Sequence, residues 1–441
     1  MPRSCRGKLV EVHRFAVLYF ARSQSRKAQQ LMSGSSLSSS LDASITVRQR
    51  KPSSVPVRIF AACLTSILVA VHYTNYSPLI TTIRAELHIS SAQAGLMSTL
   101  LFLGLASTYI PAGALVDRYG ARPVLIWFSG LILLGGVLLP IFATLPWILF
   151  CRLLVGLGSG GAFLAGAAVS AGLGKHASLG QGLYGGATQV GSGLGLLVTP
   201  LFLHLFGWRG SFLVWGLLAA LSVLVWLFVN DGETTHTPTK IDMGAAARSP
   251  SVWTLGLSHL GTFGLGNAIA AWLTIYLIDV YSLPLALAAT FGSFALLTGM
   301  FFRPLGGVLI GRRVIGAIPL LRMGTILGFL GVAILAFPLH TPILAILGIS
   351  CIAIGSTIPY TSVFNSAANL KSVGKGMAQG FVSMISSPTV IIGPPVIGYI
   401  LDRTKNFSYA FSFILLFGLV AITASFLAGP AVKQETRLSA E

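Results

Sequence analysis

The chain has 441 residues, of which 54% are hydrophobic and only 9% are charged, whereas soluble globular proteins carry about 25% charged residues. This composition excludes a soluble globular protein and predicts a protein that crosses a membrane many times. Its 50 glycines and 21 prolines are typical of closely packed, locally broken membrane helices and argue against a coiled coil or a β-barrel. The formal net charge of +18 does not indicate nucleic-acid binding, because the basic residues gather in one tail and in the connections between apolar runs.

The first 31 residues are polar and irregular, hold seven basic residues and contain no apolar run long enough to span a bilayer. A serine-rich stretch opens at Met32, so translation from Met32 is an alternative start. We expect residues 1–56 to form a disordered cytoplasmic tail. The cysteines, which are Cys5, Cys63, Cys151 and Cys351, show no paired spacing, and we therefore expect no metal site, redox site or cofactor.

Beyond the tail, the chain contains apolar runs of about 20 residues or more, the length that crosses a bilayer as a helix. We expect twelve spans, at 57–80, 91–116, 122–143, 146–171, 180–204, 210–229, 252–279, 285–310, 317–338, 341–366, 376–400 and 408–429. The polar segment 230–250 divides them six plus six. The sequence thus predicts an all-α polytopic protein with a six-helix bundle at 57–229, a cytoplasmic central loop at 230–250, a second bundle at 251–429 and a cytoplasmic tail at 430–441.

The lysines and arginines fix the expected orientation. With a cytoplasmic N-terminus, 15 of those from residue 32 onward fall on the inside and four on the outside, as the positive-inside rule requires. Both termini are then cytoplasmic, and we expect the plasma (inner) membrane. The two halves also match at a fixed offset of 194, which pairs Gly113 with Gly307 and Arg118 with Arg312 and indicates a duplicated bundle with a binding site between the copies.

The connection between the second and third spans reads Gly113-Ala-Leu-Val-Asp117-Arg118-Tyr-Gly120-Ala-Arg122. This segment resembles the cytoplasmic loop signature of the major facilitator superfamily, and the resemblance, which covers residues 57–430, implies its fold of 12 transmembrane helices in two six-helix bundles. The second copy, Gly307-Val-Leu-Ile-Gly311-Arg312-Arg313, has Gly311 where the acid would stand. The resemblance implies a cytoplasmic latch between the halves; the alternative is that Asp117 and Arg118 only anchor the loop and set topology.

Arg152, in the fourth span, precedes a run of small residues from Gly156 to Ala162 and resembles the embedded arginine of the superfamily. An arginine at the centre of a membrane helix costs about 2.5–3.5 kcal/mol, so we expect it to face protein or a water-filled cavity; snorkelling to the outer face is the alternative. Arg303, beside Pro304 and Gly306, is interpreted as structural.

The resemblance implies that the first, fourth, seventh and tenth helices line a central cavity, and polar residues inside the spans fall mainly on those helices. The candidate cavity residues are His72, Tyr73, Asn75, Arg152, Gln189, Asn267, Trp272, Tyr360 and Asn365. For each, a hydrogen bond between helices without substrate contact is the alternative. No aspartate or glutamate falls in mid-membrane, so a proton carried on a buried carboxylate is disfavoured, and His72 is the candidate proton carrier because an unperturbed imidazole titrates near neutral pH.

These features predict a secondary transporter that moves a small solute, an organic anion or a neutral metabolite, by alternating access. A multidrug or metabolite efflux antiporter of the same fold is an alternative. The glycine-rich fifth span resembles the antiporter motif of the superfamily but lacks its glycine-proline step, which the eleventh span has in Gly393-Pro394-Pro395. A membrane-embedded enzyme is disfavoured because catalytic and metal-ligand motifs are absent from the sequence, and a transporter-like sensor would need a signalling domain. The expected partners are the substrate, any coupling ion and membrane lipids, with no nucleic acid, and we expect a monomer.

Overall fold

The computed structural model describes residues 52–231, 243–339, 341–370, 373 and 375–438. These residues form helices and the turns between them, with no strand in the described ranges. From Pro52 onward the chain forms one compact unit. The tail expected at 1–51 and the middle of the central loop lie outside the described residues, and the boundaries proposed for the two bundles stay a prediction.

The N-terminal half contributes the first six spans. Its elements are α3 (Val55–Thr74), η1 (Ser77–Leu79), α4 (Ile80–Leu87), α5 (Ser91–Tyr119), α6 (Ala121–Leu138), η2 (Leu139–Ile141), α7 (Leu145–Ala171), η3 (Gly174–His176), α8 (Ala177–Leu218) and α9 (Ala220–Phe228). Local sequence fixes several starts: Ser90 and Gln93 form a reciprocal capping box at α5, and proline stands in the first turn of α3 and α7, where its missing N–H has no helical partner to lose.

The C-terminal half repeats this plan. Its elements are α10 (Met243–Arg248), α11 (Pro250–His259), η4 (Leu260–Gly264), α12 (Leu265–Tyr281), α13 (Leu285–Leu297), α14 (Gly299–Gly311), α15 (Ala317–Ala336), α16 (Pro342–Thr357), α17 (Tyr360–Ala368), α18 (Lys375–Ile385), α19 (Pro388–Thr404) and α20 (Phe407–Leu438). The seventh span, α11 to α12, passes through the π-helical turn η4, a feature that is often found at functional sites.

Twelve spans can be followed through the described residues. Eleven continuous helical stretches are long and apolar enough to cross a membrane, and one of these, Leu179–Phe228, has 50 residues. At 1.5 Å per residue a straight helix of that length would measure about 75 Å, more than twice the hydrocarbon thickness. Gly207, with φ 69° and ψ 178°, breaks it into two helices, so this stretch supplies the fifth and sixth spans.

The internal duplication appears in matching contacts of the two halves. Arg122, at the start of α6, donates to the carbonyls of Trp226 and Leu227 at the end of α9. Arg322, near the start of α15, donates to the carbonyls of Ser425 and Phe426 in α20. In each half an arginine in the first two turns of the third helix therefore binds backbone carbonyl groups of the sixth helix, at the end of α9 in the N-terminal half and within α20 in the C-terminal half.

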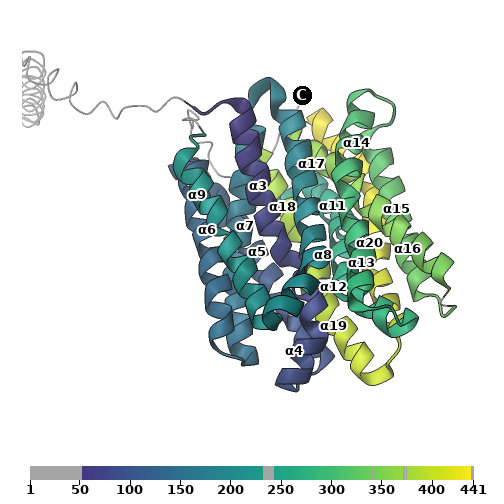
Figure 1. Cartoon of the computed structure of the whole chain (residues 1–441). Helices are drawn as coiled ribbons and strands as arrows, with labels where there is room; N and C mark the ends of the chain where they lie inside the picture. Colours follow the sequence, from purple (N-terminus) through teal and green to yellow (C-terminus); the bar gives the residue numbers. More distant parts are fainter. Residues whose placement is uncertain (1–51, 232–242, 340, 371–372, 374, 439–441) are drawn as a thin grey trace, which may run out of the picture. The chain divides into compact units, whose positions relative to one another are not determined.

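The two halves pack along two helix pairs. Across their interface α5 lies against α18 and α19, and α8 lies against α13 and α14. The glycine-rich fifth span and the Gly-Pro-Pro-containing eleventh span both belong to these pairs, as expected from their composition. In Figure 1 the start of α3 and the C-terminus lie at one end of the bundle, called the terminal end below, whereas α4 lies at the opposite end, called the far end.

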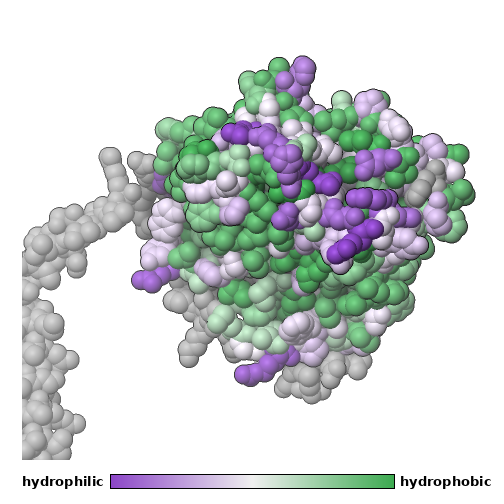
Figure 2. Space-filling model, turned by 90° about the horizontal axis from the view of Figure 1, so that it is seen from below, coloured by the Kyte–Doolittle hydropathy of each residue, from purple (hydrophilic) through white to green (hydrophobic). Residues whose placement is uncertain are grey.

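Buried apolar residues are distributed differently at the two ends. At the far end one cluster contains residues of both halves, such as Ile83 and Met97 with Trp272 and Ile397. At the terminal end buried residues form one cluster in the N-terminal half, around Trp226, and another in the C-terminal half. Viewed from below, the far end shows hydrophilic residues over a largely hydrophobic body (Figure 2). The halves are thus joined by a common core at the far end.

Candidate functional site

Arg152 is enclosed within the N-terminal half. Its guanidinium is 1% exposed and donates from Nε to the carbonyl of Met97 at 3.1 Å, from one terminal nitrogen to Asn75 Oδ1 at 3.1 Å and from the other to the carbonyl of His72 at 2.9 Å. The ring of Tyr76 lies 5.1 Å from its central carbon. Arg152 therefore ties the fourth span to the first and second spans, and it does not snorkel.

His72 and Asn75 belong to this same cluster. Both side chains are buried, and Asn75 Nδ2 lies 3.4 Å from His72 Nδ1. His72 Nε2 is buried without a hydrogen-bond partner. The predicted trio of His72, Asn75 and Arg152 is thus brought together by the structure, within one half and toward the far end.

A second buried arginine, Arg303, lies between the halves. Its guanidinium, 4% exposed, belongs to α14 and donates to two groups of α8: the carbonyl of Gly185 at 2.7 Å and Gln189 Oε1 at 3.0 Å. On its other side the central carbon lies 4.2 Å from the centroid of the Tyr360 ring of α17. Arg303 Nε is buried with no hydrogen-bond partner.

The sequence-based interpretation of Arg303 as a structural residue did not predict its place between the halves. A signal for it was available, because the cost of embedding an arginine in an apolar span applies to Arg303 as it does to Arg152. Two predicted candidates, Gln189 and Tyr360, converge on Arg303 from different halves. The arginine that was set aside is therefore the one that connects them.

Aromatic rings continue from this arginine across the interface. The Tyr360 ring packs at a tilt against Phe364, with centroids 4.6 Å apart, and His259 lies edge-on to Phe364 at 5.4 Å. His259 is also stacked on Phe263, which contacts Phe102 of the N-terminal half at 6.1 Å. The π-helical turn holds Phe263 and follows directly after His259, so this irregular segment supplies part of the interface.

The described groups around Arg303 supply no negative charge to balance its guanidinium. The hydroxyl of Tyr73 and the imidazole of His259 lie within electrostatic range of it, and none of the aspartates and glutamates whose side chains the structure describes is buried. A buried guanidinium without a carboxylate is costly to keep in a low dielectric. The arrangement favours a negatively charged or strongly electron-rich ligand at this point.

The other predicted cavity residues have more local contacts. Tyr73 is buried and packs on Phe102 at 5.3 Å. Asn267 donates to the carbonyl of Phe263 on its own span, and Trp272 is buried with its Nε1 donating to the carbonyl of Pro394. The side chain of Asn365 is exposed.

The loop-signature residues lie at the terminal end. Gly120, with φ 81°, both ends α5 and precedes α6, a conformation that favours glycine. The guanidinium of Arg118 is exposed and lies over the ring of Tyr119, and Arg122 binds carbonyl groups of its own half. Gly113 and Asp117 are in α5, and the orientation of the Asp117 side chain lies outside what the structure describes. In the second copy, Gly307 and Gly311 are in α14, and Arg312 and Arg313 are exposed.

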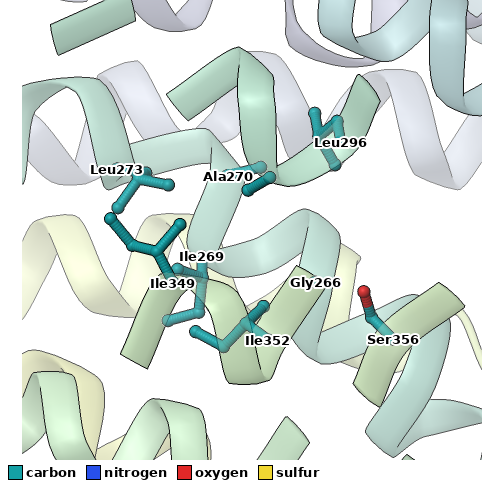
Figure 3. A pocket seen from close by; sticks show the side chains of 9 residues that line it. Gly266, Ile269, Ala270, Leu273, Leu296, Ile349, Ile352 and Ser356 are labelled. Atoms are coloured by element: carbon teal, nitrogen blue, oxygen red, sulfur yellow. The ribbon is translucent and has the colours of Figure 1, made fainter. Parts of the chain in front are cut away.

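A small pocket, partly open to solvent, lies inside the C-terminal half between the seventh, eighth and tenth spans. Apolar side chains such as Ile269, Leu273 and Ile352 line it, and Ser356 is its one hydroxyl-bearing residue (Figure 3). It contains neither Arg303 nor Arg152. The pocket therefore lacks the polar groups that a charged solute needs.

The family model described as the Major Facilitator Superfamily matches residues 62–374. The chain is 28% identical over 359 residues to the probable nitrate transporter NarT of Staphylococcus epidermidis, an alignment that covers 78% of this chain and 89% of that protein. It is 24% identical to the chloroplastic ascorbate transporter of Arabidopsis thaliana, over 78% of this chain and 70% of that protein. It is 26% identical to the nitrite extrusion protein of Bacillus subtilis, over 76% and 85%.

Among solved structures, the chain is similar to a bacterial homolog of the human lysosomal transporter Spinster, in its inward-facing and occupied conformation. The TM-score is 0.71 at 17% identity, over 87% of this chain and 99% of that chain. This similarity shows a common fold. It confirms the expected arrangement of 12 transmembrane helices in two six-helix bundles.

Proposed function

Because the chain belongs to the major facilitator superfamily, and is therefore a multi-pass membrane transporter and not an enzyme, we propose that it carries small anions and binds them at Arg303. The observation that carries this proposal is the buried guanidinium between the halves, which contacts Gly185 and Gln189 of one half and Tyr360 of the other. A ligand placed there touches both halves at once, which alternating access requires of a transported solute.

An anion at this point would supply the charge that the interface lacks. Arg303 Nε is unpartnered and offers a charge-assisted hydrogen bond to an oxygen anion. Tyr73 and Gln189 stand on the opposite side of the interface from Tyr360, so polar groups surround the cation from both halves. The relatives named for nitrate, nitrite and ascorbate transport are consistent with this charge preference.

Arg152 has a different role in this proposal. Its nitrogens are already bonded to Met97, Asn75 and His72, so it stabilises the packing of the N-terminal half. The cationic site expected from the sequence is therefore moved from Arg152 to Arg303, and His72, enclosed in the Arg152 cluster, is not placed to touch the solute.

We also propose an orientation in the membrane and a gate. We place both termini and the terminal end in the cytoplasm of a cell bounded by the plasma membrane, because the positive-inside count favours this orientation. The loop signature with Asp117 then lies on the cytoplasmic side as a latch. The protein works as a monomer among membrane lipids in this proposal, with any coupling ion as a further partner.

The test is ligand-dependent thermal stability of the purified protein, with nitrate, nitrite and ascorbate as anions and with glucose and choline as neutral and cationic controls. A ligand at 100 times its Kd stabilises the folded state by about 2.7 kcal/mol. We expect an anion to raise the melting temperature of the wild type and of Arg152→Gln, and to leave Arg303→Gln unchanged. Arg152→Gln should lower the melting temperature without ligand. Stabilisation by choline, or an undiminished anion response in Arg303→Gln, would overturn the proposal.

A further inference from the structure

A second Gly-x-x-x-Asp-Arg sequence lies at the far end of the bundle. Gly398-Tyr-Ile-Leu-Asp402-Arg403 has the same spacing as Gly113 to Arg118, and it ends α19, the eleventh span. Its partner across the interface is α5, the helix whose opposite end carries Asp117. One helix pair thus has an acid at each end.

The carboxylate of Asp402 binds the other half of the protein directly. Its Oδ1 accepts from the backbone N–H of Ser91 at 3.0 Å, and its Oδ2 accepts from that of Ala92 at 3.0 Å. These are the first two N–H groups of α5, which have no partner within the helix. A carboxylate there also interacts favourably with the positive end of the helix dipole.

Two glycines let the helices approach closely enough for this bond. A methyl group at Gly398 would collide with the backbone of Ser91 and Ala92. A methyl group at Gly95 would lie 2.6 Å from the carbonyl oxygen of Pro394. The contact surface at this end is therefore backbone against backbone, and it cannot part without breaking both bonds to Asp402.

We propose that Asp402 is a far-end latch that holds the two halves together when the terminal end opens and that releases when the far end opens. The common apolar core at the far end and the separate cores at the terminal end match the state in which this latch is closed. The inference needs the alternating access of the family but not the anion specificity proposed above.

The ion pair with Arg84 contributes less to holding Asp402 than the hydrogen bonds at the start of α5 do. Its guanidinium lies 3.8 Å from Asp402 Oδ1, and both side chains are partly exposed, so solvent screens the pair. The hydrogen bonds to Ser91 and Ala92 are charge-assisted and cross the interface, and they supply most of the attraction that closes the latch.

The experiment measures the far-end distance without any substrate. Spin labels are attached to Ala85→Cys in α4 and Thr404→Cys at the end of α19, both exposed positions, in full-length protein whose native cysteines are replaced by alanine. Double electron–electron resonance in lipid then reports the populations of short and long separations. We expect the short separation to dominate in the wild type, and Asp402→Asn to raise the ratio of long to short populations about tenfold.

The matched control is Glu86→Gln. Glu86 is also a far-end carboxylate, but its partners, Arg209 at 2.8 Å and Trp208, belong to its own half. We expect Glu86→Gln to leave the distance distribution unchanged and Asp402→Glu to shift it less than Asp402→Asn. If Asp402→Asn fails to accumulate, Asp402→Ser, which keeps one acceptor, takes its place. An unchanged distribution in the Asp402 variants, or an equal shift in Glu86→Gln, would overturn the latch whatever the substrate proves to be.

Discussion

The two buried arginines show how the partners of a side chain decide its role. Arg152 donates to a side chain and two carbonyls of its own half, whereas Arg303 donates across the interface and keeps Nε without a partner. Both pay a similar insertion cost. Arg152 offsets that cost with hydrogen bonds within one bundle, whereas Arg303 keeps one nitrogen without a partner, which our proposal assigns to the anion.

At the residue scale, Gly185 determines how closely Tyr360 can approach Arg303. A Cβ at Gly185 would lie 2.7 Å from Tyr360 Cε1 and 3.2 Å from Cζ, so Gly185→Ala should push the ring off the guanidinium. A buried cation–π contact contributes about 2 kcal/mol. We expect the KM for anion transport to rise about tenfold and the melting temperature to fall as well, because the same buried contact is present without ligand. Transport kinetics in proteoliposomes measure this.

Gly182→Ala is the matched control, since it lies in the same helix and a Cβ there meets nothing within 4 Å. Alanine should leave transport unchanged at this position and stabilise the helix by up to about 1 kcal/mol. Equal KM values for the two variants would show that the Tyr360 ring does not help to bind the anion.

At the element scale, hydropathy was sufficient to place the twelve spans, because each must present about 20 apolar residues to lipid. It could not show that Gly207 joins the fifth and sixth spans through a single kink, or that the seventh span contains the π-helical turn at 260–264. Both are local backbone conformations that a hydropathy pattern does not encode.

The candidate site was harder to predict for a related reason. Most faces of these helices are apolar, so periodicity does not reveal which face of α14 meets α8. The partners of Arg152 include two backbone carbonyls, which no side-chain pattern announces. Gln189 and Tyr360 were found as rare polar residues in apolar spans, but the arginine that connects them was identified only from the packing of the two halves.

The terminal end of α5 holds the acid of the loop signature. Asp117 lies in its last turn, and α18, which begins at Lys375, packs against α5 at the terminal end. A carboxylate charge is favoured near a helix N-terminus, so we expect Asp117→Asn to insert normally and to transport about tenfold more slowly or worse. Quantitative blotting and initial uptake rates measure the two effects.

Gly311→Asp is the companion variant, because it places an acid in the second copy of the motif. A Cβ at Gly311 meets no atom within 4 Å, so the added side chain has room and should change transport only mildly. Normal transport by Asp117→Asn would reduce the loop signature to a topology signal.

At the scale of the whole molecule, the cores describe one state of a two-state protein. The far end is joined by apolar residues of both halves and by Asp402, whereas the terminal end has a separate core in each half. Transport requires a second state in which the far end is open and the terminal end is closed. At the far end the polar contact of Asp402 with the start of α5 can break without exposing a large apolar surface.

The driving force follows from the charges in the interface. None of the carboxylates with described side chains is buried, so we expect a monovalent anion bound at Arg303 to move without a proton on one of these carboxylates and to carry net charge. An interior-positive potential of 100 mV should then favour anion uptake into proteoliposomes by about 2.3 kcal/mol, or roughly 50-fold in accumulation. Uptake at equal pH on both sides, with potassium and valinomycin setting the potential, measures this. If a histidine carried one proton with each anion, uptake would be electroneutral and would not respond to the potential. Uptake would then follow an inward proton gradient, and His259→Gln or His72→Gln would abolish this response to the gradient.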